Sequence, residues 1–274
     1  VGEVFGDVET TKKFCTYNGM DGLHTIFLFQ TLSTPFKAEK WRKMVQEFEH
    51  NFPSPFVPTY VFSNHDRRRS ITPLGNDVRK AKLLALFQFT VRGIPFTYYG
   101  EELGIEKPTL PLKTGKDPLA QRYKSIPQFM VNWTGQSLNR DECRTPMLWD
   151  STENAGFSKV QPWLPVAYNY NTINVESQSV DSNSLMTFYQ QILEFRNTTP
   201  ALRKGTLEVD KDLSNRKFFA YYRVLDKDRF LVIMNFTSQV QRLNVNKGEK
   251  VFSTHPNNEL FDFQAYEGRV YKLN

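Results

Sequence analysis

Three short apolar runs alternate with two segments of helical periodicity over the first hundred residues, and this order restricts the fold most. The runs are HTIFLFQ (24–30), TYVFSN (59–64) and IPFTYYG (94–100). Continuous apolar runs of this length are typical of strands that are buried on both faces. Strand, helix, strand, helix, strand with short connections predicts parallel βαβ units, and therefore an α/β fold.

The helical segments between these runs have defined starts and ends. Four apolar residues are spaced as one helical face: Trp41, Met44, Val45 and Phe48. Thr34 and Pro35 precede them and predict the N-cap and the first helical residue. The second helix is predicted over 78–93, where Gly93 ends it.

Beyond Glu101 the periodicity is lost until about Asn183, and long stretches of this kind in compact domains usually carry function. A helix is predicted from Leu185 to before Pro200. Four alternating segments then predict a small antiparallel β domain with one buried face: 218–224, 230–237, 240–245 and 269–273. The expected division is a parallel α/β part over 1–199 and a β domain over 200–274.

Composition narrows the class of protein. The net charge of +6 is spread along the chain and does not by itself indicate nucleic acid. Cys15 and Cys143 lie too far apart for a disulfide framework or a metal-ligand spacing, so free thiols in a reducing, cytoplasmic setting are favoured over secretion. No apolar run reaches 18 residues, and no membrane-spanning helix is expected.

Polar residues follow three of the predicted strands, where parallel α/β folds usually place catalytic groups. They are Glu3, His65-Asp66 and Glu101-Glu102. Each also has a plain structural interpretation: a charge at a frayed terminus, a helix cap, and a charge at the rim of the sheet.

Three arginines, Arg67 to Arg69, follow His65-Asp66 and could form a phosphate or nucleic-acid patch. No basic surface interleaved with aromatic residues accompanies them. A solvated charge run is therefore favoured, and no nucleic-acid partner is expected.

Four motifs taken together resemble one known family. They are VGEVFGD (1–7), FSNHDRRRS (62–70), GIPFTYYGEELG (93–104) and RDECRTPMLWD (140–150). Their order and separation resemble the carboxyl-terminal half of the α-amylase family of glycoside hydrolases, and the last motif resembles its α-glucosidase and oligo-1,6-glucosidase branch. The resemblance implies strands five to eight of a (β/α)8 barrel of the TIM type, followed by an antiparallel β-sandwich domain.

The resemblance also implies roles for individual residues. Glu3 matches the general acid/base and Asp66 the carboxylate that stabilises the transition state. His65 matches the residue that hydrogen-bonds the sugar in the cleavage subsite, and Arg69 matches an arginine that lines the substrate path. The Glu101-Glu102 pair matches family framework and is left out of the catalytic set.

A retaining glycosidase needs a carboxylate nucleophile opposite its acid, about 5–5.5 Å away. The family's nucleophile lies on the fourth strand, which would precede Val1. The resemblance therefore implies a fragment of a larger enzyme, inactive alone, that acts on short oligosaccharides such as maltose, isomaltose, sucrose or trehalose. No cofactor is expected, and the calcium site of some relatives would also precede Val1.

Two departures from the branch bear on substrate choice. Pro73, where oligo-1,6-glucosidases commonly have arginine, leaves linkage preference open. Glu142, where the branch usually has glycine, indicates an unusual specificity. Transglycosylases and isomerases of the same family, such as trehalose synthase and sucrose isomerase, are alternatives. The heavy chains of amino-acid transporters are a non-catalytic alternative, which predicts a membrane-spanning helix upstream.

Overall fold

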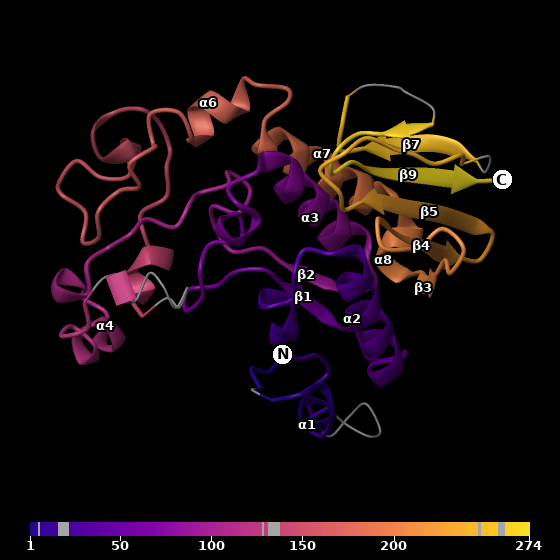
Figure 1. Cartoon of the computed structure of the whole chain (residues 1–274), viewed down its shortest axis with the longest axis horizontal. Helices are drawn as coiled ribbons and strands as arrows, with labels where there is room; N and C mark the ends of the chain where they lie inside the picture. Colours follow the sequence, from indigo (N-terminus) through magenta and orange to yellow (C-terminus); the bar gives the residue numbers. More distant parts are fainter. Residues whose placement is uncertain (5, 16–21, 128, 131–137, 246–247, 257–260) are drawn as a thin grey trace. The chain divides into compact units, whose positions relative to one another are not determined.

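A computed structural model describes residues 1–4, 6–15, 22–127, 129–130, 138–245, 248–256 and 261–274 (Figure 1). The chain forms two compact units. The first contains Val1–Val61, Lys82–Phe96 and Tyr189–Asn274, and the second contains Phe62–Ala81 and Thr97–Phe188. The first unit thus takes residues from both sides of position 199, and the boundary expected there stays a prediction.

Two strands of the first unit pair in parallel, as the βαβ pattern predicted. They are β1 (Thr59–Val61) and β2 (Ile94–Phe96), with Thr59 opposite Ile94. Both are shorter than the apolar runs that contain them. β1 ends early because Asn64 forms a turn, in which its side-chain oxygen accepts a hydrogen bond from the Asp66 amide at 2.9 Å.

The strand predicted over 24–30 is not continuous. Ile26 forms a single parallel bridge with Gly2, and a 3₁₀ turn, η1 (Phe29–Leu32), follows. Threonine side chains take the place of a backbone ladder to β1. The Thr59 hydroxyl accepts from the Leu28 amide at 3.1 Å and donates to the Ile26 carbonyl at 2.6 Å. The run therefore lies beside β1, as a buried strand would, without strand geometry of its own.

Helix α2 (Ala38–Asn51) buries the predicted face, but it begins three residues after Pro35. The Lys37 amide donates to the Pro35 carbonyl at 2.7 Å, and this tight turn delays the helix. α3 (Val78–Thr90) begins where it was predicted but ends three residues before Gly93, and α7 (Leu185–Thr198) forms where its periodicity predicted it. Within the first unit, the Phe87 ring of α3 packs edge-on against Trp41 and Tyr60, at centroid distances of 4.8 and 5.2 Å.

The antiparallel sheet has the strand order β3-β4-β5-β9-β7 (Figure 1). Its strands are β3 (Thr206–Val209), β4 (Phe218–Leu225), β5 (Asp228–Asn235), β7 (Glu249–Ser253) and β9 (Gly268–Leu273). A separate pair joins β6 (Gln241–Arg242) to β8 (Asp262–Phe263). Two short helices, α1 (Val8–Lys12) and α8 (Pro200–Lys204), complete the first unit.

The expectation of one buried face was wrong for the central strands, which are buried on both. Phe218 and Ile233 pack with Phe263 on one side of the sheet. On the other, Phe219 lies 6.4 Å from the Phe87 ring, and the Tyr221 hydroxyl is 2.6 Å from that of Thr90. Helices cover this second face, so alternation in the sequence does not mark it as exposed.

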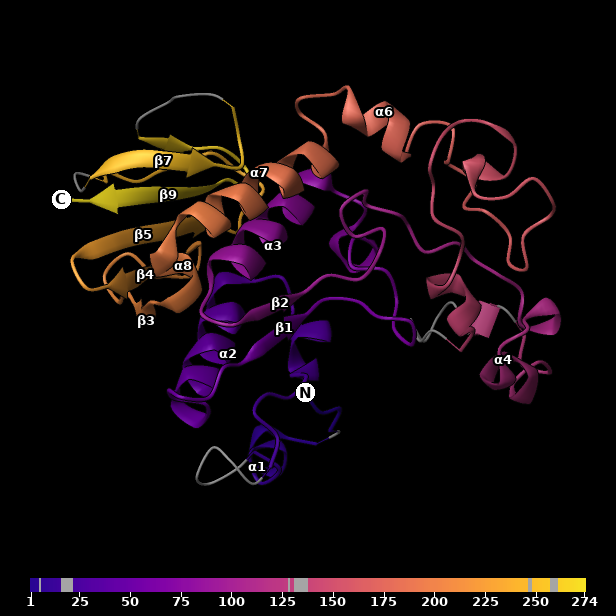
Figure 2. The same ribbon diagram turned by 180° about the vertical axis from the view of Figure 1, so that it is seen from behind.

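The second unit is built from turns and short helices, in agreement with the lost periodicity of 101–183 (Figure 2). Its elements are η2 (Thr72–Leu74), η3 (Leu112–Thr114), α4 (Pro118–Arg122), η4 (Arg140–Cys143), η5 (Glu153–Gly156) and α6 (Val175–Ser179). An apolar cluster of Leu103, Ile105, Leu148, Ala155 and Ala167 forms its core.

Candidate active site

His65 and Asp66 follow β1 in a turn that the structure defines closely. Besides the contact to Asp66, the Asn64 carbonyl accepts a hydrogen bond from the Arg67 amide at 3.3 Å. No helix begins at this turn, since the next helical element starts at Thr72, so the interpretation of 64–66 as a helix cap was wrong. The turn leaves the His65 ring exposed and the Asp66 carboxylate partly exposed.

Two arginines bind the Asp66 carboxylate from the η4 region. Arg140 Nη1 donates to Oδ1 at 3.1 Å, and Arg144 Nη2 donates to the same oxygen at 2.8 Å. Arg144 Nε also donates to the His65 carbonyl at 2.9 Å. Charge-assisted bonds of this kind are about twice as strong as neutral ones, and here they fix both the carboxylate and its turn. The remaining oxygen, Oδ2, lies 3.6 Å from His65 Nε2.

Sequence reasoning did not assign these arginines, although both lie in the motif RDECRTPMLWD. Asp117 in turn holds Arg140. The Arg140 Nη2 and Nε donate to its carboxylate at 2.7 to 3.0 Å. Burial opposes ionisation of Asp117, yet the hydrogen bonds from Arg140 outweigh it and lower the pKa of this carboxyl. The same bonds raise the pKa of Arg140. A chain of charges therefore runs from Asp117 through Arg140 to Asp66.

Arg69 lies inside the second unit, with its side chain 1% exposed. It donates to the carbonyls of Tyr99 and Thr145, and its guanidinium lies 4.5 Å from the centre of the Tyr99 ring. These contacts tie the segment after β1 to the segment after β2. The contact with substrate implied for Arg69 stays a prediction.

Glu101 is buried behind the same turn. Its Oε1 accepts a hydrogen bond from the Ser63 hydroxyl, and Oε2 has no partner among the described residues. Burial raises the pKa of Glu101 to about 8, so the group is mostly a neutral acid at pH 7. Its contact with Ser63 lies inside the second unit.

Glu142, the departure from the branch's glycine, is also internal. It accepts from Lys107 Nζ at 2.5 Å and from the Leu110 amide at 3.0 Å. The side chain therefore anchors the segment 107–110 in the second unit.

Glu3 lies in the first unit, after the bridge between Gly2 and Ile26, and is exposed. Val4, which follows Glu3 in the sequence, lines a hollow of about 230 Å³ together with Gly6, Phe29, Gln30 and Ser33. Asp66 belongs to the other unit, and the pairing of the two carboxyls stays a prediction.

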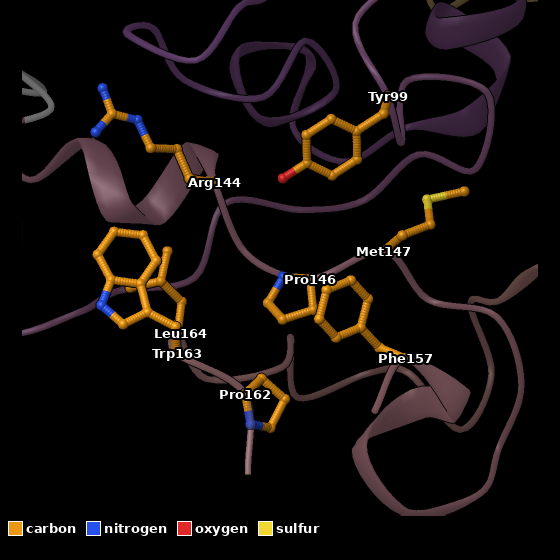
Figure 3. A pocket seen from close by; sticks show the side chains of 8 residues that line it. All are labelled: Tyr99, Arg144, Pro146, Met147, Phe157, Pro162, Trp163 and Leu164. Carbon is orange, nitrogen blue, oxygen red and sulfur yellow. The ribbon is translucent and has the colours of Figure 1, made fainter. Parts of the chain in front are cut away.

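Arg144 also lines a hollow of about 280 Å³ within the second unit (Figure 3). Its other walls are Tyr99, Pro146, Met147, Phe157, Pro162, Trp163 and Leu164. Over the part of the chain that the structure describes, no three His, Cys, Asp or Glu side chains gather as metal ligands would. Neither cysteine is in a disulfide bond. Within the same residues, no helix combines the length and apolar character needed to cross a bilayer.

Comparison with known proteins identifies the family of this chain. The protein-family model of the α-amylase catalytic domain matches residues 1–205 of this chain. A trehalose-6-phosphate hydrolase of Bacillus subtilis (strain 168) is 36% identical over 185 residues, which cover 63% of this chain and 33% of the relative. An oligo-1,6-glucosidase of Parageobacillus thermoglucosidasius is 28% identical over 264 residues, covering 87% of this chain and 46% of the relative.

A solved structure, the trehalulose synthase MutB from Pseudomonas mesoacidophila MX-45, superposes with a TM-score of 0.85 at 24% identity. The match covers 98% of this chain and 54% of that one, and it concerns the fold alone. The matched parts of the chain thus span between a third and about half of the length of each of these proteins. Because the catalytic-domain model matches about three quarters of its residues, the chain belongs to the α-amylase family of glycoside hydrolases.

Proposed function

We propose that these 274 residues are part of a retaining α-glucosidase that acts on short α-glucosides. In this proposal they form strands five to eight of its (β/α)8 barrel and a trailing β domain. The observation that carries it is Asp66, which follows a parallel strand and is held by Arg140 and Arg144. The names of the relatives, oligo-1,6-glucosidase among them, support the substrate class.

The proposed reaction has two displacements. A carboxylate nucleophile outside residues 1–274 attacks the anomeric carbon, while Glu3 gives its proton to the departing glycosidic oxygen. Water then attacks the glycosyl-enzyme as Glu3 takes a proton from it, and the nucleophile leaves. Asp66 stabilises the positive charge that develops on the sugar ring, and His65 hydrogen-bonds a hydroxyl of the same ring.

The two arginines give Asp66 a fixed direction before substrate arrives. A preorganised charge needs no reorganisation at the moment of reaction, and this is where electrostatic catalysis gains most. Arg140 and Arg144 are positioning residues in this scheme. The cytoplasmic location expected from the cysteines stays a prediction, as does a calcium requirement.

The test uses the full gene product, incubated with maltose, isomaltose, sucrose and trehalose, with products separated by chromatography. Glu3→Gln should lower kcat/KM about 10²- to 10⁴-fold on these sugars. It should lower kcat/KM far less on p-nitrophenyl α-glucoside, because the leaving group of this substrate needs no protonation. The kcat on p-nitrophenyl α-glucoside should still fall, because Glu3 also takes the proton of the attacking water. Glu153→Gln, at an exposed position of the second unit, is the matched control.

Equal loss of kcat/KM on both substrate types, or no loss, would contradict the role of Glu3. Conversion of sucrose to an isomer instead of free glucose and fructose would replace hydrolysis by the isomerase alternative. Residues 1–274 expressed alone are expected to be inactive, and turnover by this chain would contradict an external nucleophile.

A further inference from the structure

Three aromatic side chains remain exposed around the hollow that Arg144 lines. The exposed fractions are 37% for Tyr99, 48% for Phe157 and 62% for Trp163. The hollow, at about 280 Å³, lies near the lower limit of small-molecule sites, and its lining is mostly apolar, as in such sites (Figure 3). All of its walls belong to the second unit.

Two of the rings are held in place by the protein. Lys116 Nζ lies 5.5 Å from the centre of the Trp163 ring and donates to the Trp163 carbonyl at 2.6 Å. The Arg69 guanidinium lies 4.5 Å from the Tyr99 ring, and the Tyr99 hydroxyl donates to the Thr145 carbonyl at 2.7 Å. Cations thus support these rings, so binding a ligand would cost little ordering entropy.

Phe157 is held by its backbone. Asn154, Ala155 and Gly156, which precede it, all have positive φ, and the Phe157 amide donates to the Asn154 carbonyl at 3.0 Å. A side chain at Gly156 would collide with the Asp150 carboxylate, so only glycine fits at this position of the turn. This tight turn fixes where the ring leaves the backbone.

The aromatic rings and the arginine that line the hollow together favour one class of ligand. The faces of aromatic rings carry partial negative charge and attract the C–H groups on the flat face of a pyranose ring. Among the described residues, Arg144 uses Nε and Nη2 for His65 and Asp66, and Nη1 is available there as a donor for a sugar hydroxyl. A purely apolar ligand would leave this donor unused.

We propose that Tyr99, Phe157 and Trp163 form a subsite for a glucosyl unit of an oligosaccharide, beside Asp66. Arg144 joins the two places, because it both lines the hollow and binds the Asp66 carboxylate. This inference deepens the proposed function, on which its ligand class rests. It assigns the enzyme a preference for oligosaccharides whose additional sugar units can occupy the hollow.

Kinetics of the full gene product provide the first test. Trp163→Ala and Phe157→Ala should each raise KM for maltotriose or isomaltotriose roughly 3- to 10-fold, with kcat unchanged. KM for p-nitrophenyl α-glucoside should stay the same, because this substrate has no second sugar unit to place in the hollow. Trp149→Ala is the matched control, since that ring is 50% exposed and lies outside the lining of the hollow.

Equilibrium binding separates this inference from the proposed function. Calorimetry with maltotriose on a Glu3→Gln background should show saturable binding that Trp163→Ala weakens and Trp149→Ala does not. That result upholds the subsite even when the gene product cleaves no α-glucoside. Unchanged maltotriose affinity in both Trp163→Ala and Phe157→Ala, or no binding by the folded protein, overturns it. If an alanine variant melts early, Phe157→Leu replaces it, because leucine keeps the apolar volume without the aromatic face.

Discussion

Replacing Glu101 with glutamine should remove most of the pH dependence of stability that this carboxyl causes. The side chain is buried, and the Ser63 hydroxyl donates to one of its oxygens. Glu102 raises the pKa of Glu101 through its charge, whereas Arg69 lowers it, but burial is the largest influence. The folded protein therefore retains a proton on Glu101 that the unfolded chain releases.

The size of the effect follows from the two pKa values. Burial raises the pKa of Glu101 from an ordinary 4.5 to about 8. Each pH unit between them is worth about 1.4 kcal/mol. The contribution of this group to stability is fully present below pH 4.5, falls as pH rises, and is lost above pH 8. The free energy of unfolding should thus decrease by about 5 kcal/mol over this range from Glu101 alone.

Urea unfolding at pH 5, 7 and 9 measures this. At pH 9 Glu101→Gln should be more stable than the wild type by a few kcal/mol, because a neutral amide needs no ionisation. At pH 5 it should be less stable by about 1–2 kcal/mol, because the amide nitrogen lacks an acceptor. Glu153→Gln, an exposed change, should leave the pH profile unaltered. Parallel profiles of wild type and Glu101→Gln would refute the reasoning.

Three further changes test the charge networks. Arg140→Gln leaves Asp117 buried without its partner and removes one bond from Asp66, so we expect about 3–5 kcal/mol less stability. kcat should also fall roughly 10-fold, and Asp117→Asn in the same chain should restore stability but not kcat. Lys107→Met should cost about 3 kcal/mol in a urea melt, because it removes the cation that binds the buried Glu142 carboxylate, and Glu142→Gln should recover part of this loss. Arg223→Met should lower the midpoint of unfolding strongly, because Arg223 donates to the carbonyls of Leu202 and Gly205 inside the first unit; an unchanged midpoint would contradict this.

Much of the first unit could be predicted because its signals are local. The buried face of α2, the start of α3 and the extent of α7 follow from local sequence signals, chiefly residues three and four positions apart. The segment 24–30 could not be predicted in the same way. Its geometry depends on the hydroxyl of Thr59, more than thirty residues away, which takes over bonds that a strand would make with its backbone. The second buried face of β4 likewise depends on α3, which is remote in sequence.

The candidate site likewise contains residues that could be predicted from local sequence and residues that could not. His65 and Asp66 could be found because a polar pair ends an apolar run, and because the motif around them is compact. What orients Asp66 comes from 74 and 78 residues further along the chain, in a stretch without periodicity. Such a stretch has no repeating apolar face, so spacing in the sequence does not show which of its side chains contact distant segments. The aperiodic residues after β2 therefore do more than cover the site, since Arg140 and Arg144 set the direction of its carboxylate and Arg144 connects that carboxylate to the aromatic hollow. It follows that substitutions in 140–144 should alter catalysis and oligosaccharide preference together, whereas changes at Phe157 or Trp163 should alter preference alone.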